Sequence, residues 1–97
     1  MRIDLSIEAR THIARVDAWW RANRPSAPDL FMKELHEALL ALGTMPSLGV
    51  RYKSKPNVRR LLLNRSRQQV YFKEEPERIL VVAVWGTQRR YGPPIKG

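Results

Sequence analysis

The 97-residue sequence contains no cysteine, so it can form neither a disulfide framework nor a cysteine-based zinc site. It has no apolar run long enough to span a membrane, and its N-terminus lacks the pattern of a signal peptide. It also lacks a glycine-rich phosphate loop and a nucleophile motif, and neither His12 nor His36 has an acidic pair at metal-ligand spacing. We therefore expect a cytoplasmic protein with no membrane partner, no metal and no cofactor.

Acidic residues are scarce in the second half of the chain. Residues 1–50 carry six basic and six acidic residues, whereas residues 51–97 carry twelve basic residues and three acidic ones. The whole net charge of +9 therefore lies in the second half. Such an asymmetry favours a polyanionic partner, either nucleic acid or an acidic protein segment, over a merely soluble surface.

The length predicts one domain, residues 1–97, which begins with a strand and two helices. Residues 1–6 alternate as a strand with one buried face, and Ser6 can cap a helix that ends near Asn23, before Pro25. A second helix is predicted from Ser26 or Ala27 to a C-cap near Gly43. Together the two make an antiparallel helical hairpin.

Extended patterns fill the rest of the chain. Residues 50–54 alternate, residues 55–57 break the pattern, and strands are predicted at 58–63, 68–73 and 79–85. Short turns join these strands, so they must be antiparallel neighbours. The predicted fold is α+β, in the order β-α-α-β-β-β, with the helical hairpin packed on one face of an antiparallel sheet.

The last strand, residues 79–85, is continuously apolar and predicts burial on both faces. Strict alternation would place Ile79, Val81, Ala83 and Trp85 on one face and the residues between them on the other. Because the hairpin can cover only one face, we expect the other to be covered by loops, by the C-terminal residues 93–95 or by another chain.

Arginines and aromatics alternate around the end of this strand and along the two strands before it. Arginine suits bidentate contact with phosphate or carboxylate, and aromatic rings can stack on bases. Antiparallel pairing can bring these side chains to one edge of the sheet. The predicted partner-binding residues are Arg59, Arg60, Arg67, Tyr71, Trp85, Arg89, Arg90 and Tyr91. No catalytic residue is predicted.

Three segments follow one another in this element order: Val58-Arg-Arg-Leu-Leu-Leu, Gln69-Val-Tyr-Phe-Lys and Arg78-Ile-Leu-Val-Val-Ala-Val-Trp-Gly-Thr-Gln-Arg-Arg. In this order the chain resembles the ParE/RelE superfamily of bacterial toxins. The resemblance spans nearly the whole chain and implies the toxin of a type II toxin–antitoxin module, involved in growth arrest and plasmid stabilization. It implies a cognate antitoxin as partner, with operator DNA contacted only through that antitoxin.

Two branches of the superfamily imply different targets. The RelE-like branch cuts mRNA on the ribosome with a cluster of basic residues, but the resemblance places two of its arginines at Gln68 and Gln88 and one of its lysines at Leu61. The Val84-Trp-Gly-Thr-Gln-Arg-Arg ending is closer to the ParE branch, which inhibits DNA gyrase by binding it. We therefore expect a gyrase inhibitor rather than an enzyme. The alternatives are a ribosome-dependent mRNA endonuclease and a degenerate relative that only binds its antitoxin.

Overall fold

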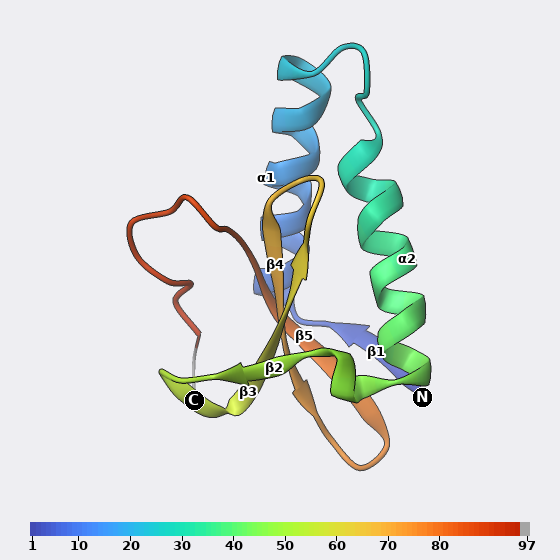
Figure 1. Cartoon of the computed structure of the whole chain (residues 1–97), viewed down its shortest axis with the longest axis vertical. Coiled ribbons are helices and arrows are strands. Elements are labelled where there is room, and N and C mark those ends of the chain that lie inside the picture. Colours follow the sequence, from blue (N-terminus) through green and yellow to red (C-terminus); the bar gives the residue numbers. More distant parts are fainter. Residues whose placement is uncertain (96–97) are drawn as a thin grey trace.

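A computed structural model describes residues 1–95 of the chain. Two helices stand side by side as an upright hairpin, and a twisted sheet lies against them (Figure 1). The elements in chain order are β1 (Arg2–Leu5), α1 (Ile7–Asn23), α2 (Leu30–Thr44), a 3-10 helix η1 (Pro46–Leu48), β2 (Val50–Tyr52), β3 (Lys55–Leu63), β4 (Gln68–Glu74) and β5 (Arg78–Gly86). The predicted α+β fold with a helical hairpin on the sheet is confirmed.

The sheet has five strands in the order β1-β5-β4-β3-β2. Strands β2 to β5 pair antiparallel, as predicted, but β1 pairs with β5 in parallel, so the sheet is mixed. Parallel neighbours need a long connection, and nearly the whole chain separates these two strands. The order is therefore β-α-α-β-β-β-β, with β2 as an additional short strand at one edge.

Residues 55–57 do not break the extended structure but begin β3. The register between β2 and β3 shifts at this point, where Tyr52 lies opposite Lys55 and Arg51 lies opposite Arg59. Pro56 falls in the shifted stretch, so its missing N–H interrupts no ladder hydrogen bond.

Helix α1 begins and ends as the sequence predicts. The hydroxyl of Ser6 accepts a hydrogen bond from the backbone N–H of Ala9 at 3.0 Å, and the last helical residue is Asn23. Helix α2 begins later than predicted, at Leu30, because the residues before it form turns closed by the backbone N–H groups of Ala27 and Leu30. It ends one residue beyond Gly43, at Thr44.

A β-bulge in β5 changes which residues face the helices. Tyr71 on β4 lies opposite Ala83, but the next residue, Phe72, lies opposite Val81, so Val82 is one residue extra. An extra residue reverses the alternation beyond it. Ile79, Val81 and Val84 therefore join the core beneath the helices, while Ala83 and Trp85 join the cluster on the other side. The prediction that residues 79, 81, 83 and 85 share one face is wrong for this reason.

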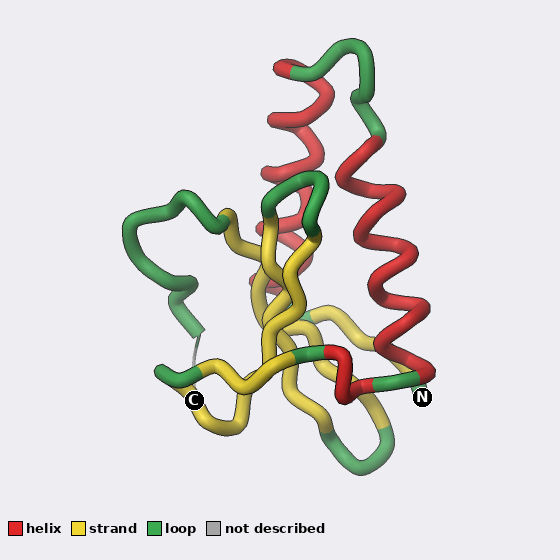
Figure 2. The backbone as a smooth tube through the Cα atoms, in the orientation of Figure 1, coloured by secondary structure: helices red, strands yellow, loops and turns green. Residues whose placement is uncertain are grey.

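The side of the sheet away from the helices, which we call the sheet face, is covered in part by the C-terminal segment. Val58, Tyr71 and Ala83 are buried there, and Ile95 packs against them. Pro93 is buried as well. A Cβ atom on Gly92 would lie 2.5 Å from the Tyr52 hydroxyl, so the segment runs close to this ring. Of the three kinds of cover expected for this face, the structure shows the C-terminal segment, which packs through Ile95, and Figure 2 shows the segment as a long loop beside the strands.

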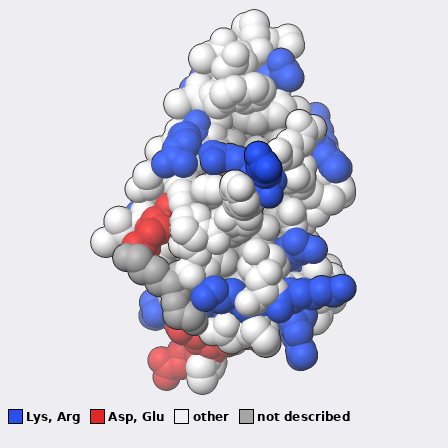
Figure 3. Space-filling model, turned by 90° about the vertical axis from the view of Figure 1, so that its left-hand side faces the viewer, with Lys and Arg blue, Asp and Glu red and all other residues white. Residues whose placement is uncertain are grey.

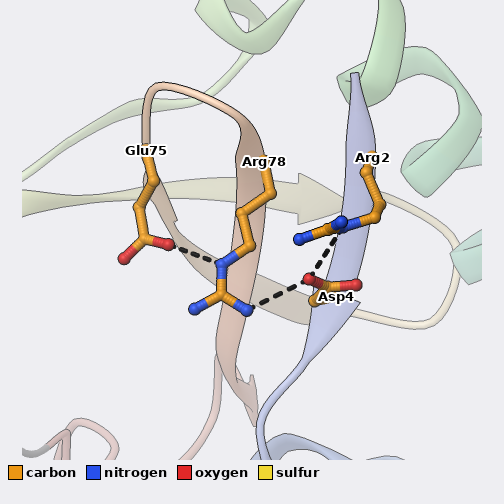
Figure 4. A network of polar contacts seen from close by, with 4 residues as sticks. All are labelled: Arg2, Asp4, Glu75 and Arg78. Atoms are coloured by element: carbon orange, nitrogen blue, oxygen red, sulfur yellow. Dashed lines mark hydrogen bonds and ion pairs between the residues drawn. The ribbon is translucent and has the colours of Figure 1, made fainter.

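An ion-pair network fastens β1 and the β4–β5 turn to β5 (Figure 4). The Arg78 guanidinium donates to the Glu75 carboxylate at 2.6 Å and to the Asp4 carboxylate at 3.0 Å, and Arg2 contacts the same Asp4 oxygen at 3.1 Å. The hydrogen bond from Arg78 is the main reason that the pKa of Asp4 lies below its ordinary value. Among the described residues, no helix is long and apolar enough to cross a membrane.

Candidate functional site

The end of β5 carries four of the predicted site residues. The Arg89 guanidinium carbon lies 4.2 Å from the centroid of the Trp85 ring, at cation–π distance. The indole N–H of Trp85 donates to the backbone carbonyl of Tyr91 at 2.7 Å, which holds the C-terminal segment against the strand end. Arg90 and Tyr91 are exposed, and the Tyr91 side chain retains 74% of its accessible surface. The segment thus presents one guanidinium stacked on an indole and another 5.7 Å from the centroid of the exposed Tyr91 ring.

On the sheet face, two more predicted residues lie directly opposite each other. Arg60 on β3 pairs with Tyr71 on β4, and the Tyr71 ring meets Tyr52 edge-on at 5.0 Å. The Arg60 guanidinium lies 5.6 Å from the Tyr52 ring centroid. Burial raises the pKa of the Tyr71 hydroxyl, although its hydrogen bond with Arg60 opposes this. Arg60, Tyr71 and Tyr52 therefore form one compact cluster beside the C-terminal segment.

Arg59 does not belong to either group. It lies opposite Phe72, which is in the core beneath the helices, so its side chain starts from the opposite face to that of Arg60. Its guanidinium donates to the backbone carbonyl of Gly49 at 3.0 Å. Arg59 thus holds the loop before β2 in place. The expectation that Arg59 lies at the same edge of the sheet as Arg60, Arg89 and Arg90 is wrong, because consecutive residues of a strand point to opposite faces.

A groove of about 640 Å³ lies between α1, the β3–β4 turn and the end of β5. We call it the arginine groove. It contains two predicted site residues, Arg67 and Arg89, and three further arginines, Arg15, Arg24 and Arg65. The remaining lining comes from residues that are aromatic, apolar or uncharged: His12, Val16, Trp19, Trp20, Ser66, Gln68, Val84, Gly86, Thr87 and Gln88. Within the described part of the chain, no Asp or Glu lines it.

Figure 3 views the molecule from the side on which the C-terminal segment lies. Lys and Arg side chains are spread over this side, whereas Asp and Glu are confined to its left margin and its lower end. The charge asymmetry of the sequence therefore becomes a largely cationic surface in the folded chain.

The β3–β4 turn is held in place by Glu34 of α2. One carboxylate oxygen of Glu34 accepts the backbone N–H of Arg65 at 2.8 Å, and the other accepts the backbone N–H and the hydroxyl of Ser66 at 2.9 and 2.6 Å. Arg67, which follows, has a positive φ of 61°, a conformation that costs a side-chain-bearing residue about 1 kcal/mol or more. Its carbonyl accepts the backbone N–H of Thr87 at 3.0 Å, so the turn is also tied to the end of β5. These contacts bring the turn arginines to the groove.

His12 lies at the floor of the groove. Its Nδ1 accepts the backbone N–H of Val84 at 3.2 Å, and its ring meets that of Trp85 edge-on at 5.2 Å. Burial lowers the pKa of His12, and the charges of Arg15 and Arg89 lower it further. The neutral ring, with its proton on Nε2, is the form that this geometry requires.

Sequence reasoning missed the contribution of α1. His12, Arg15 and Trp19 follow one another at spacings of three and four, which places them on one helical stripe. Taken alone, such a stripe is typical of core packing beside a solvated helix surface. The signal that could have found it is an arginine between two aromatic rings on the face next to the apolar stripe.

No protein-family model and no curated protein matches the sequence. The structure, however, is similar to a solved structure described as the chromosomal ParDE toxin–antitoxin (TA) system from P. aeruginosa. The similarity has a TM-score of 0.77 at 16% identity and covers 91% of this chain and 97% of that one. The fold is ParE-like.

On this ParE-like fold, the predicted residues divide between two surfaces. Arg67 and Arg89 line the arginine groove, and Arg60 and Tyr71 lie on the sheet face. Trp85 joins the two, since it packs against the sheet-face cluster and also meets His12. Residues 1–95 contain no group of three or more His, Cys, Asp or Glu that could hold a metal ion. At both surfaces, guanidinium groups lie beside aromatic rings, so both can bind anions and stack on flat rings.

Proposed function

We propose that this chain is the toxin of a type II toxin–antitoxin module that acts in the cytoplasm by binding and inhibiting DNA gyrase. The proposal is supported by the ParE-like fold, which is shared with a ParDE toxin–antitoxin system. It is also supported by the Arg89-Arg90 ending after β5. In this role the chain causes growth arrest, and in plasmids such a module serves plasmid stabilization.

One observation favours gyrase binding over RNA cleavage. Cleavage of RNA needs several basic groups that converge on the scissile phosphate, to stabilise charge and to protonate the leaving group. Arg59 and Arg60 start from opposite faces of β3, and Arg59 is engaged with the Gly49 carbonyl. An inhibitor that acts by binding needs no such convergence.

The antitoxin surface that we propose is the end of β5 together with the sheet face. Arg60, Arg89 and Arg90 offer charge there, and Trp85 and Tyr91 offer aromatic surface. An extended or helical antitoxin segment that carries both acidic and apolar residues fits this combination. Operator DNA is then bound only through the antitoxin.

The test is a supercoiling assay with purified gyrase and increasing amounts of the chain, with and without a candidate cognate antitoxin. We expect supercoiling to be blocked by the chain and restored by the antitoxin. Replacement of both Arg89 and Arg90 by alanine should weaken antitoxin binding, whereas Arg10→Ala, an exposed change on α1, should not. Full supercoiling at a molar excess of the chain would contradict the proposal.

The alternative is a ribosome-dependent mRNA endonuclease, which a second observation favours. Gln68 and Gln88, where the RelE-like resemblance expects arginines, both line the arginine groove beside Arg67 and Arg89. Neighbouring arginines could replace the missing ones. Cuts in mRNA on translating ribosomes that disappear with Arg89→Ala or Tyr91→Phe would favour this function. Uncut mRNA under conditions that arrest growth would exclude it.

A further inference from the structure

The arginine groove has the composition of a site for a ligand rather than that of a solvated surface. Its five arginines come from three separate parts of the fold: Arg15 from α1 and Arg24 from its C-cap, Arg65 and Arg67 from the β3–β4 turn, and Arg89 from beyond β5. Like charges gathered around one cavity repel one another, and an anion bound between them would relieve this repulsion. The ion pairs of Arg2, Arg21 and Arg78 show where arginines of this chain find carboxylates, and all three lie outside the groove.

The shape and the remaining lining restrict the anion. The cavity of about 640 Å³ falls within the range of small-molecule sites, roughly 300–1,000 Å³. One wall is apolar and aromatic: Trp19 keeps 48% of its surface exposed, and Trp20 meets it edge-on at 5.8 Å. A ligand that suits the groove therefore carries several negative charges at one end and a flat apolar ring at the other.

The density of charge distinguishes a free nucleotide from a nucleic-acid strand. A strand brings a single negative charge for each nucleotide. A nucleoside diphosphate or triphosphate adds a charge for each inner phosphate and about two on the terminal one. Five arginines around one cavity match the dense charge of a nucleoside polyphosphate better than the single charges of a strand. Arginine also binds such phosphates in bidentate fashion.

We propose that the arginine groove binds a nucleoside polyphosphate, with its phosphates among Arg15, Arg67 and Arg89 and its base against Trp19. The inference goes beyond the proposed function, because it concerns binding by the isolated chain and requires neither gyrase nor an antitoxin. Arg24 lies 5.2 Å from the centroid of the Trp19 ring, and the 48% of Trp19 that stays exposed is available to the base. Glu34 acts indirectly, since its carboxylate holds the β3–β4 turn that carries Arg67.

The experiment is isothermal titration of the purified full chain with ATP, GTP, AMP, adenosine, inorganic triphosphate and a short single-stranded oligonucleotide. Triphosphates should bind more tightly than AMP, and adenosine should bind least. Arg15→Ala and Arg67→Ala should each weaken ATP binding about tenfold or more, since each removes a charge-assisted contact. Arg10→Ala, which removes an exposed arginine of the same helix outside the groove, is the matched control and should change it less than twofold.

A second variant separates base recognition from simple charge attraction. Trp19→Ala should weaken ATP binding severalfold and leave inorganic triphosphate binding unchanged. Equal affinity for ATP and inorganic triphosphate, unaffected by Trp19→Ala, would mean an adventitious ion only. Tighter binding of the oligonucleotide than of ATP would overturn the inference and identify the ligand as a nucleic-acid strand. The absence of binding at millimolar ATP would also overturn it. Circular dichroism of each variant confirms that a loss of binding is not a loss of fold.

Discussion

Replacing Glu34 by glutamine tests how the β3–β4 turn is held. The wild-type carboxylate accepts three hydrogen bonds, two through one oxygen from Ser66 and one through the other from the Arg65 backbone N–H. The side-chain amide of glutamine keeps one oxygen as an acceptor, but its NH₂ group would face a donor group of Arg65 or Ser66. One charge-assisted bond is lost and the other two are weakened, which should lower the free energy of unfolding by about 2 kcal/mol. For a chain of this size, that corresponds to a fall of roughly 8–16 °C in Tm.

The pH dependence gives the same test a second readout. Partial burial raises the pKa of Glu34, but the hydrogen bonds from Ser66 and from the Arg65 backbone lower it more, so the pKa in the folded chain lies below the ordinary value of 4.5. A group with a depressed folded pKa stabilises the protein above its unfolded pKa, and this stabilisation is lost as the pH falls through the folded pKa. The advantage of the wild type over Glu34→Gln should therefore be full at pH 6–7 and shrink below about pH 4.5.

The assay is urea denaturation followed by tryptophan fluorescence at a series of pH values. Glu37→Gln removes the same charge from an exposed position of the same helix, and it should change the free energy of unfolding by no more than about 0.5 kcal/mol. Equal stability of Glu34→Gln and wild type at pH 7 would refute the reasoning. So would a difference that stays constant down to pH 3.

Three further changes test the packing, the histidine and the exposed tail. Gly49→Ala should cost about 1–3 kcal/mol in urea denaturation, because its Cβ would collide with the buried Phe72 ring, whereas Gly86→Ala, with its closest contact at 3.6 Å, should be nearly neutral. Burial and nearby arginines depress the pKa of His12, so the free energy of unfolding should fall as the pH drops below about 6.5, and this slope should be absent from His12→Asn, which cannot titrate. Arg90→Ala should leave the free energy of unfolding within about 0.5 kcal/mol of wild type in the same assay, and a larger loss would show that this side chain is structural.

Local signals in the sequence predicted most of the fold. The Ser6 cap, the stop before Pro25 and the apolar run of β5 are short-range features, and the structure confirms each of them. The parallel pairing of β1 with β5 is set by contacts between residues far apart in the chain, which no local pattern encodes. The bulge at Val82 also escaped prediction, because an uninterrupted apolar run shows no alternation from which a register could be read.

The candidate site was only partly predictable. The excess of arginine in the second half indicated a cationic surface, and Arg67 and Arg89 do meet in one groove. Arg59 and Arg60 were expected to act together, but neighbours on a strand cannot share a face. Arg15 and Trp19 could not be predicted, because the packing of a helix on the sheet decides which of its faces meets a groove. That packing is a tertiary property.

The extra residue in β5 has a consequence for the direction in which the chain leaves the sheet. One inserted residue turns every later side chain through half a revolution, so Val84 reaches the helices while Trp85 emerges on the far side. Deleting Val82 would swap these destinations, and an indole would be forced into the interior. The parity of a single strand thus decides which of two adjacent side chains, Val84 or Trp85, packs in the core beneath the helices.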